Sequence, residues 1–243
     1  MAGCAAPPAR APDPALRAAT AVVQLSSGEP ARCRATGAAI HLGQGRFVTA
    51  AHVVDGSAQR LRGGCPAGAA PLVLSVAGSP APARLLGTGQ DRIEPGIGQR
   101  YLGGQDVALV VPLRPLPSLG TATLCAAPPV AGTPALLVTP RRAQRTRLLG
   151  LVAEADPRFG AYLEIPETLA QGESGGAVFE AESGCLAGLV SHRDEPAAGQ
   201  PALPRTRLVP AAVVAGFLAG IAPVTAPATA PVTAPVAARV TAP

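Results

Sequence analysis

Gly172-Glu173-Ser174-Gly175-Gly176 sets a serine in a glycine-rich turn, and the apolar segment 177–179 follows it directly. Glycine has no Cβ atom, so such a turn can bring backbone N–H groups close to a bound molecule. In a hydrolytic site these groups stabilise a developing oxyanion. We expect the N–H groups of Gly172 and Ser174 to be the donors. The stretch therefore predicts a serine nucleophile on a loop that a buried strand carries.

Two earlier segments supply the partners that a serine nucleophile needs. A serine hydroxyl needs a base to take its proton, and the base needs a third group to fix its tautomer and orientation. Thr49-Ala50-Ala51-His52 ends an expected strand at a histidine, and Asp106 directly precedes the apolar run 107–111. We expect His52 as the base and Asp106 as its orienting group. Asp55 is nearer to His52 in sequence, but we expect it to point away on the same short helical turn.

In this order and setting, the three motifs resemble the chymotrypsin/trypsin-like serine proteases. The resemblance covers roughly residues 21–221. It implies an all-β fold of two packed six-stranded antiparallel barrels, with the active site between them and a short helix at the C-terminal end. It also implies a serine endopeptidase that works through an acyl-enzyme, without a cofactor or a metal ion. The alternative is a protease-like fold that acts as a non-catalytic binding or scaffold module in the cell envelope. The three retained residue types argue against that alternative.

Glu173 departs from the family pattern, which usually has Asp immediately before the nucleophile. In members activated by cleavage, that Asp pairs with a newly freed N-terminus. No obvious activation site precedes residues 21–25, so we expect activity that does not depend on such a cleavage. The alternative is that Glu173 is a tolerated variant with no mechanistic role.

Four residues are expected to contact the substrate. The resemblance maps the floor of the primary pocket to Thr168, and the absence of Asp there argues against a preference for Arg or Lys. A small or apolar side chain next to the cut site is expected instead. Ser191, His192 and Arg193 map to the strand that pairs with an extended peptide. Ser191 is also expected to help hold Asp106. Arg193, where the family often has Gly, narrows the pocket, favours acidic residues or points to solvent.

The chain divides into four predicted regions: a flexible tether at 1–20, a first barrel at 21–120, a second barrel with its helix at 121–222, and a disordered tail rich in Pro, Ala and Thr at 223–243. Residues 121–125 and 146–153 are expected strands, and residues 210–219 an expected helix. The polar, glycine-rich stretch 87–104 predicts a long loop, of the kind that often forms a lid or a substrate wall.

The five cysteines indicate the compartment. The resemblance implies a disulfide between Cys125 and Cys185, and a second pair, Cys33 with Cys65, is expected across the His52 region. Disulfides are typical of oxidising compartments, so we expect a secreted, periplasmic or cell-envelope protein. Reduced, buried cysteines are the alternative.

Met1-Ala2-Gly3-Cys4 resembles the end of a bacterial lipoprotein signal. Cys4 is therefore a candidate for lipidation, and a lipid there would be the sole link to a membrane. The alternative is an irrelevant thiol in a disordered N-terminus.

Composition sets limits on other partners. All 20 basic residues are arginine, the net charge is +5, and aromatic residues make up only 2%. Arg141, Arg142, Arg145 and Arg147 form a basic cluster, which we interpret as a solvated hairpin tip because few aromatic side chains are available for stacking on bases. We therefore expect protein or peptide substrates and no nucleic acid. No C-x-x-C spacing occurs, so zinc is not expected. A monomer is expected.

Overall fold

The computed structural model describes residues 13–29, 33–57, 65, 71–94, 98–194 and 204–221. Six strands, each antiparallel to its neighbours, close the first barrel in the order β1–β2–β3–β8–β5–β4. Their bounds are β1 Val22–Ser27, β2 Ala35–His41, β3 Phe47–Thr49, β4 Leu72–Val76, β5 Ser79–Thr88 and β8 Ala108–Pro112. Apolar side chains on one face of these strands fill the barrel, among them Leu25, Phe47, Leu74 and Val110. The alternating burial along β4 is the period-two pattern expected of such a strand.

The second unit is a seven-stranded antiparallel sheet in the order β10–β9–β13–β14–β15–β12–β11. Its strands are β9 Pro134–Val138, β10 Ala143–Arg147, β11 Gly150–Ala153, β12 Ala161–Ile165, β13 Ala177–Glu180, β14 Leu186–Asp194 and β15 Arg205–Pro210. Two short strands, β6 Asp91–Glu94 and β7 Gly98–Tyr101, form a separate hairpin. The helices are α1 Pro14–Ala19, α2 Ala51–Val54 and α4 Ala211–Ala219, with 3-10 turns at η2 Leu102–Gly104 and η3 Pro157–Phe159.

The predicted all-β, chymotrypsin-like fold with a short C-terminal helix is confirmed, with three differences in the second unit. The second unit was expected as a six-stranded barrel but is a seven-stranded sheet. Residues 146–153 were expected as one strand but contribute to two, β10 and β11. The chain turns between them, where Gly150 has a φ of 110° that favours glycine. The expected strand at 121–125 is reduced to one bridge, between Leu124 and Leu186.

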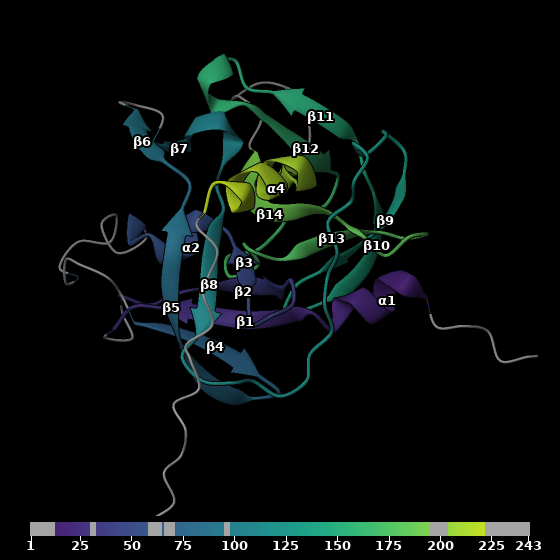
Figure 1. Cartoon of the computed structure of the whole chain (residues 1–243). Coiled ribbons are helices and arrows are strands. Elements are labelled where there is room, and N and C mark those ends of the chain that lie inside the picture. Colours follow the sequence, from purple (N-terminus) through teal and green to yellow (C-terminus); the bar gives the residue numbers. More distant parts are fainter. Residues whose placement is uncertain are drawn as a thin grey trace, which may run out of the picture.

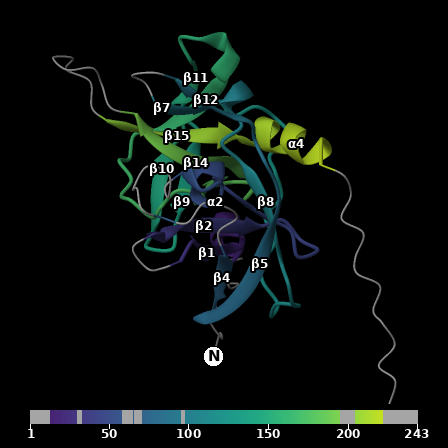
Figure 2. The same ribbon diagram turned by 90° about the vertical axis from the view of Figure 1, so that its left-hand side faces the viewer.

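A shared apolar core joins the two units. Ile40, Val48 and Leu109 from the barrel pack with Phe179 and Leu189 from the second sheet. The green strands of the second sheet lie above and beside the purple-to-blue strands of the barrel, with α4 against β14 (Figure 1). Figure 2 shows the same arrangement from the side. The functional loops described below lie where these two units meet.

Part of the predicted N-terminal tether is folded. Residues 14–19 form helix α1, whose Ala15 and Ala18 are buried in the shared core. Asp13 caps the helix, because its side chain accepts a hydrogen bond from the N–H of Ala15. The expectation of a flexible tether is therefore wrong for these residues. Cys4 and the predicted tail at 223–243 lie outside the described residues.

Both predicted disulfides are confirmed: Cys33–Cys65 and Cys125–Cys185. The first ties the start of β2 to the segment that follows α2, and the second ties the region before β9 to the start of β14. Within the described ranges, no helix is long and apolar enough to cross a membrane.

Candidate active site

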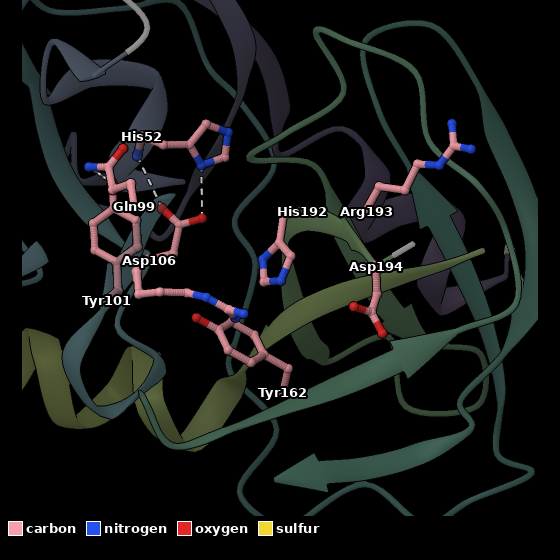
Figure 3. A pocket seen from close by; sticks show the side chains of 9 residues that line it. His52, Gln99, Tyr101, Asp106, Tyr162, His192, Arg193 and Asp194 are labelled. Atoms are coloured by element: carbon pink, nitrogen blue, oxygen red, sulfur yellow. Dashed lines mark hydrogen bonds and ion pairs between the residues drawn. The ribbon is translucent and has the colours of Figure 1, made fainter. Parts of the chain in front are cut away.

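His52 and Asp106 meet because the strands that carry them are neighbours. β3 ends at Thr49 and leads into α2, which holds His52, and Asp106 stands shortly before β8, which pairs with β3. The Nδ1 atom of His52 lies 2.8 Å from Oδ2 of Asp106. The backbone N–H of His52 also donates to Oδ1 of Asp106, at 3.1 Å. Two contacts to one carboxylate fix both the position of the histidine and the orientation of its ring (Figure 3).

Ser191 holds the same carboxylate from the second unit. Its hydroxyl donates to Oδ2 of Asp106 at 2.5 Å, and Ser191 is almost fully buried. The expectation that Ser191 lies beside Asp106 agrees with this contact. Asp55 instead accepts hydrogen bonds from Tyr101 and Gln99 on β7. The side chain that contacts the imidazole of His52 is thus Asp106.

The loop with Ser174 is wedged between the two units. The carbonyl of Ser174 accepts from the N–H of Ala38 on β2 at 2.7 Å, and the N–H of Gly175 donates to Val190 on β14 at 2.8 Å. Gly175 has a φ of 80°, and a Cβ atom there would lie 2.1 Å from the carbonyl oxygen of Ala38. Only glycine fits this position.

The hydroxyl of Ser174 is linked to the His52–Asp106 pair only through Ser191 in the part of the chain that the structure describes. It donates to the backbone carbonyl of Ser191 at 3.2 Å, and among the side chains that the structure describes it has no hydrogen bond to His52. Ser191 therefore contacts both Asp106, through its hydroxyl, and Ser174, through its carbonyl. Catalytic hydrogen bonds are often absent or long before substrate binds.

Two backbone N–H groups of this loop make no hydrogen bond to the backbone of the described residues. In the described part of the chain, the N–H groups of Gly172 and Ser174 have no backbone acceptor. Gly172 has a φ of 92°, a conformation that favours glycine and that determines where its N–H points. The sequence predicts these two groups as the oxyanion donors, and that role stays a prediction.

Charge and burial set the protonation of the pair. Burial lowers the pKa of His52, but the charge and hydrogen bond of Asp106 outweigh it, and the pKa is raised. Burial raises the pKa of Asp106, yet the contacts with His52 and the hydroxyl of Ser191 hold it below its usual value. Asp106 is therefore ionised, and His52 is a stronger base than a free imidazole.

A half-open cavity of about 300 Å³ adjoins this pair (Figure 3). Its walls come from β7, β12 and the end of β14. Besides His52 and Asp106, the lining residues are Gln99, Arg100, Tyr101, Tyr162, His192, Arg193 and Asp194. Both tyrosines of the chain are among them. Burial raises the pKa of Tyr162, so its hydroxyl stays protonated.

The predicted substrate residues fall into two groups. His192 and Arg193 line the cavity, although the guanidinium group of Arg193 points away from Asp106. Thr168 is exposed and does not line it; its carbonyl accepts a hydrogen bond from Arg142 at 3.2 Å. The role of Thr168 as a pocket floor stays a prediction.

Several residues of the cavity wall were not predicted from the sequence. Gln99, Arg100 and Tyr101 belong to the stretch predicted as a loop that walls the site, and part of that stretch is the β6–β7 hairpin. Tyr162 and Asp194 carried no signal in the sequence, because only the pairing of β12, β15 and β14 brings them here.

One cluster has the residue types of a metal site. Among the described residues, Cys125, Glu180 and Cys185 lie close together. The two sulfur atoms form a disulfide, so they are not available as thiolate ligands.

The arrangement of a closed six-stranded barrel beside a second antiparallel sheet, with a histidine–aspartate pair and a glycine-flanked serine between them, defines a chymotrypsin-like fold. The sequence profile of the family "trypsin-like peptidase domain" matches residues 35–189. The chain belongs to this family.

Solved structures with the same fold include the following proteases. The active form of Rv3671c protease from M. tuberculosis aligns over 90% of this chain and 94% of its own, with 22% identity and a TM-score of 0.59. Its inactive form aligns over 86% and 92%, with 20% identity and a TM-score of 0.59. The HtrA-type protease AlgW, solved with a tripeptide, has 18% identity and a TM-score of 0.60; the alignment covers 85% of this chain and 61% of AlgW. No curated protein sequence matches the chain significantly.

Proposed function

We propose that the protein is a serine endopeptidase in which Ser174 is the nucleophile, His52 the general base and acid, and Asp106 the group that orients His52. The observation that carries this proposal is the position of Ser191. This one residue contacts the carboxylate of Asp106 and the hydroxyl of Ser174, and so links the two ends of the proposed triad. Membership of the trypsin-like peptidase family supports the same reaction.

The reaction begins when the hydroxyl of Ser174 turns from the Ser191 carbonyl toward Nε2 of His52. His52 takes the hydroxyl proton while Oγ forms a bond to the carbonyl carbon of the peptide. The N–H groups of Gly172 and Ser174 stabilise the resulting oxyanion. His52 then gives its proton to the leaving amine as the C–N bond breaks. A water molecule, deprotonated by His52, attacks the acyl-enzyme and releases the acid and Ser174.

Asp106 acts through His52. Its Oδ2 holds the proton on Nδ1, so Nε2 faces Ser174 as the basic nitrogen. Its negative charge stabilises the imidazolium that forms after proton transfer. No cofactor or metal ion takes part in the proposed steps.

The substrate is an extended peptide that pairs with the backbone of residues 191–193, and a small or apolar side chain precedes the cut site. Extended peptides commonly add to a sheet edge through main-chain hydrogen bonds. The protein acts as a monomer in an oxidising space, as a secreted, periplasmic or envelope protein, which the two disulfides support. Lipidation of Cys4 would tether it to a membrane.

A fluorophosphonate probe tests the proposal directly, because it reacts with an activated serine. We expect the purified chain to be labelled and the variant Ser174→Ala to remain unlabelled. A peptide library then gives the cut-site preference. Absence of labelling, or equal labelling of the Ser174→Ala variant, would contradict the proposal and favour a non-catalytic binding module in the cell envelope.

A further inference from the structure

His192 is the second histidine of the site, and a break in strand pairing determines where its side chain points. Val190 pairs with Leu208 and His192 pairs with Arg207, so Ser191 is one extra residue on β14. In a regular strand neighbouring side chains point to opposite faces. The bulge removes that alternation, and the side chains of Ser191 and His192 both turn toward Asp106.

The donors and acceptors available in Asp106, Ser191 and His192 determine where the protons of this cluster lie. The ionised carboxylate of Asp106 can only accept, so the single proton of the Ser191 hydroxyl points to it. The hydroxyl oxygen lies 2.9 Å from Nδ1 of His192. Because the hydroxyl proton is already used, Nδ1 of His192 is the donor in this contact. A continuous chain of hydrogen bonds thus runs from His192 through Ser191 to Asp106. Asp106 also accepts the hydrogen bond from His52.

We propose that His192 is a positioning residue of the peptidase: its Nδ1–H keeps the Ser191 hydroxyl directed at Asp106 and thereby controls how strongly Asp106 holds the proton on His52. This inference rests on the proposed function. A hydroxyl that lacks this donor is free to rotate to other acceptors. Asp106 then loses a hydrogen bond that stabilises its charge and attracts the His52 proton more strongly.

The surroundings of His192 hold it in this state. Its ring meets the edge of Tyr162 at a centroid distance of 5.0 Å, which fixes its orientation (Figure 3). The charged groups around it are Asp106 before β8, Arg207 on β15, Glu154 after β11, Arg100 on β7 and, at the end of β14, Arg193 and Asp194. Burial lowers the pKa of His192, and Arg207 and Arg100 act in the same direction against Asp106 and Glu154. The ring is therefore neutral at pH 7, with its proton on Nδ1 and a bare Nε2.

Two substitutions separate positioning from simple lining of the cavity. His192→Phe keeps an aromatic ring against Tyr162 but has no donor, whereas the amide nitrogen of His192→Asn can replace Nδ1. The readout is the rate of labelling by a small fluorophosphonate, which has no peptide part to occupy the cavity. We expect His192→Phe to slow labelling about 3- to 10-fold and to move the acid limb of its pH profile to higher pH. His192→Asn should restore both the labelling rate and the position of the acid limb.

A double substitution tests whether the effect passes through Ser191. In a Ser191→Ala background, His192→Phe should cause no further loss. An unchanged labelling rate for His192→Phe, with only KM for peptides altered, would overturn the proposal. An equal loss in the Ser191→Ala background would also overturn it. Thermal melting of each variant checks that the fold is intact.

Nitrogen NMR of the imidazole rings gives a reading that does not need activity. We expect His192 to carry its proton on Nδ1 in the wild type, and a proton on Nε2 alone would contradict the proposed chain. If the wild type shows no Ser174-dependent labelling, the proposed peptidase function fails. The NMR result then decides the assignment of His192 by itself.

Discussion

The Nε atom of Arg142 lies 3.1 Å from a carboxylate oxygen of Glu173, the residue immediately before Ser174. The same carboxylate accepts from the hydroxyl of Thr139 at 2.9 Å and from the N–H of Ala170 at 2.7 Å. The side chain of Glu173 is only 3% exposed. A buried carboxylate needs such partners, because an unpaired charge there is strongly destabilising. Here the chain supplies the positive charge from its own arginine, on the loop between β9 and β10.

This pair bears on activation. The resemblance places Glu173 where a family member activated by cleavage has an Asp that pairs with a new N-terminus. Arg142 occupies that role without any cleavage, and Glu173 is one methylene longer than Asp. We therefore expect the loop of Ser174 to be ordered in the intact chain.

Replacing Arg142 with alanine should disorder this loop. We expect the free energy of unfolding to fall by about 2 to 4 kcal/mol. This value is at the low end of the range for buried ion pairs, because a third of the Arg142 side chain is exposed. Fluorophosphonate labelling should slow about 100-fold as the oxyanion donors move. Thermal melts and labelling rates measure the two effects, and Arg142→Lys should recover part of both.

Arg145→Ala is the matched control. Arg145 lies on the adjacent strand, is 77% exposed and pairs with Asp13 at 3.2 Å. Exposed pairs of this kind contribute about 0 to 1 kcal/mol, so labelling should be unchanged. Equal losses in the two variants would show that the basic surface as a whole is responsible, and not the contact with Glu173.

A blocked N-terminus should not affect activity. If a freed α-amino group were the partner of Glu173, acetylating the N-terminus or fusing a domain to it would prevent labelling of Ser174. Because Arg142 already fills that position, we expect the blocked and unblocked proteins to be labelled at the same rate. Labelling that starts only after trimming of the N-terminus would refute this prediction.

The pH dependence follows from the pair of His52 and Asp106. The pKa of His52 is raised above 6.5 by Asp106, so the basic form is lost at a higher pH than for a free imidazole. We expect kcat/KM to fall as the pH drops, with a midpoint above 6.5, since this ratio reports the free enzyme. In Asp106→Asn, burial lowers the pKa of His52 and is opposed only by the weaker effect of the Asp55 charge, so the midpoint should move below 6.5. The rate should fall about 10⁴-fold. An unchanged midpoint would mean that another group titrates.

The ionisation of Asp106 also affects the free energy of unfolding. The pKa of Asp106 is lowered on folding, so its contribution to stability is present above 3.8 and is lost as the pH falls through the lower folded value.

The disulfides should stabilise the fold. Cys125 and Cys185 are 60 residues apart, and a loop of that size is expected to contribute about 2 to 4 kcal/mol. The double variant Cys125→Ser/Cys185→Ser should therefore melt at a lower temperature while labelling of Ser174 continues, because neither cysteine lines the cavity beside His52. Loss of Cys33–Cys65 should lower the melting temperature and also slow the labelling of Ser174, since that bridge encloses the segment with α2. Melting curves and labelling rates of the two variants, measured in parallel, check the difference.

What the sequence predicted and what it missed have a physical explanation. His52, Asp106 and Ser174 each stand at the end of an apolar run, and such runs identify strands by local pattern. The partner of Glu173 could not be predicted, because Arg142 belongs to a cluster of arginines whose sequence pattern indicates a solvated hairpin tip. The position of His192 depends on a bulge between β14 and β15, which only the pairing of two distant strands creates. Helix α1 was missed because a short segment rich in Ala and Pro resembles a linker, while its stability comes from burial of Ala15 and Ala18.

Gly172 offers the sharpest test of the oxyanion donors. Its φ of 92° is strained for any other residue, and a Cβ atom would lie 3.1 Å from Oγ1 of Thr36. Gly172→Ala should therefore rotate the local peptide and withdraw one N–H from the site. Loss of one such donor typically lowers kcat by about 100- to 1000-fold. We expect that loss with KM nearly unchanged, because the donor acts on the transition state more than on the bound peptide.

Gly216→Ala controls for the loss of a glycine as such. Gly216 lies in α4, where a Cβ atom would meet nothing within 4 Å. Alanine at a helical position should stabilise the protein by about 0.4 to 1 kcal/mol and leave kcat unchanged. A Gly172→Ala variant with full kcat would show that the oxyanion is stabilised elsewhere, whereas a raised KM at full kcat would place Gly172 in substrate binding alone.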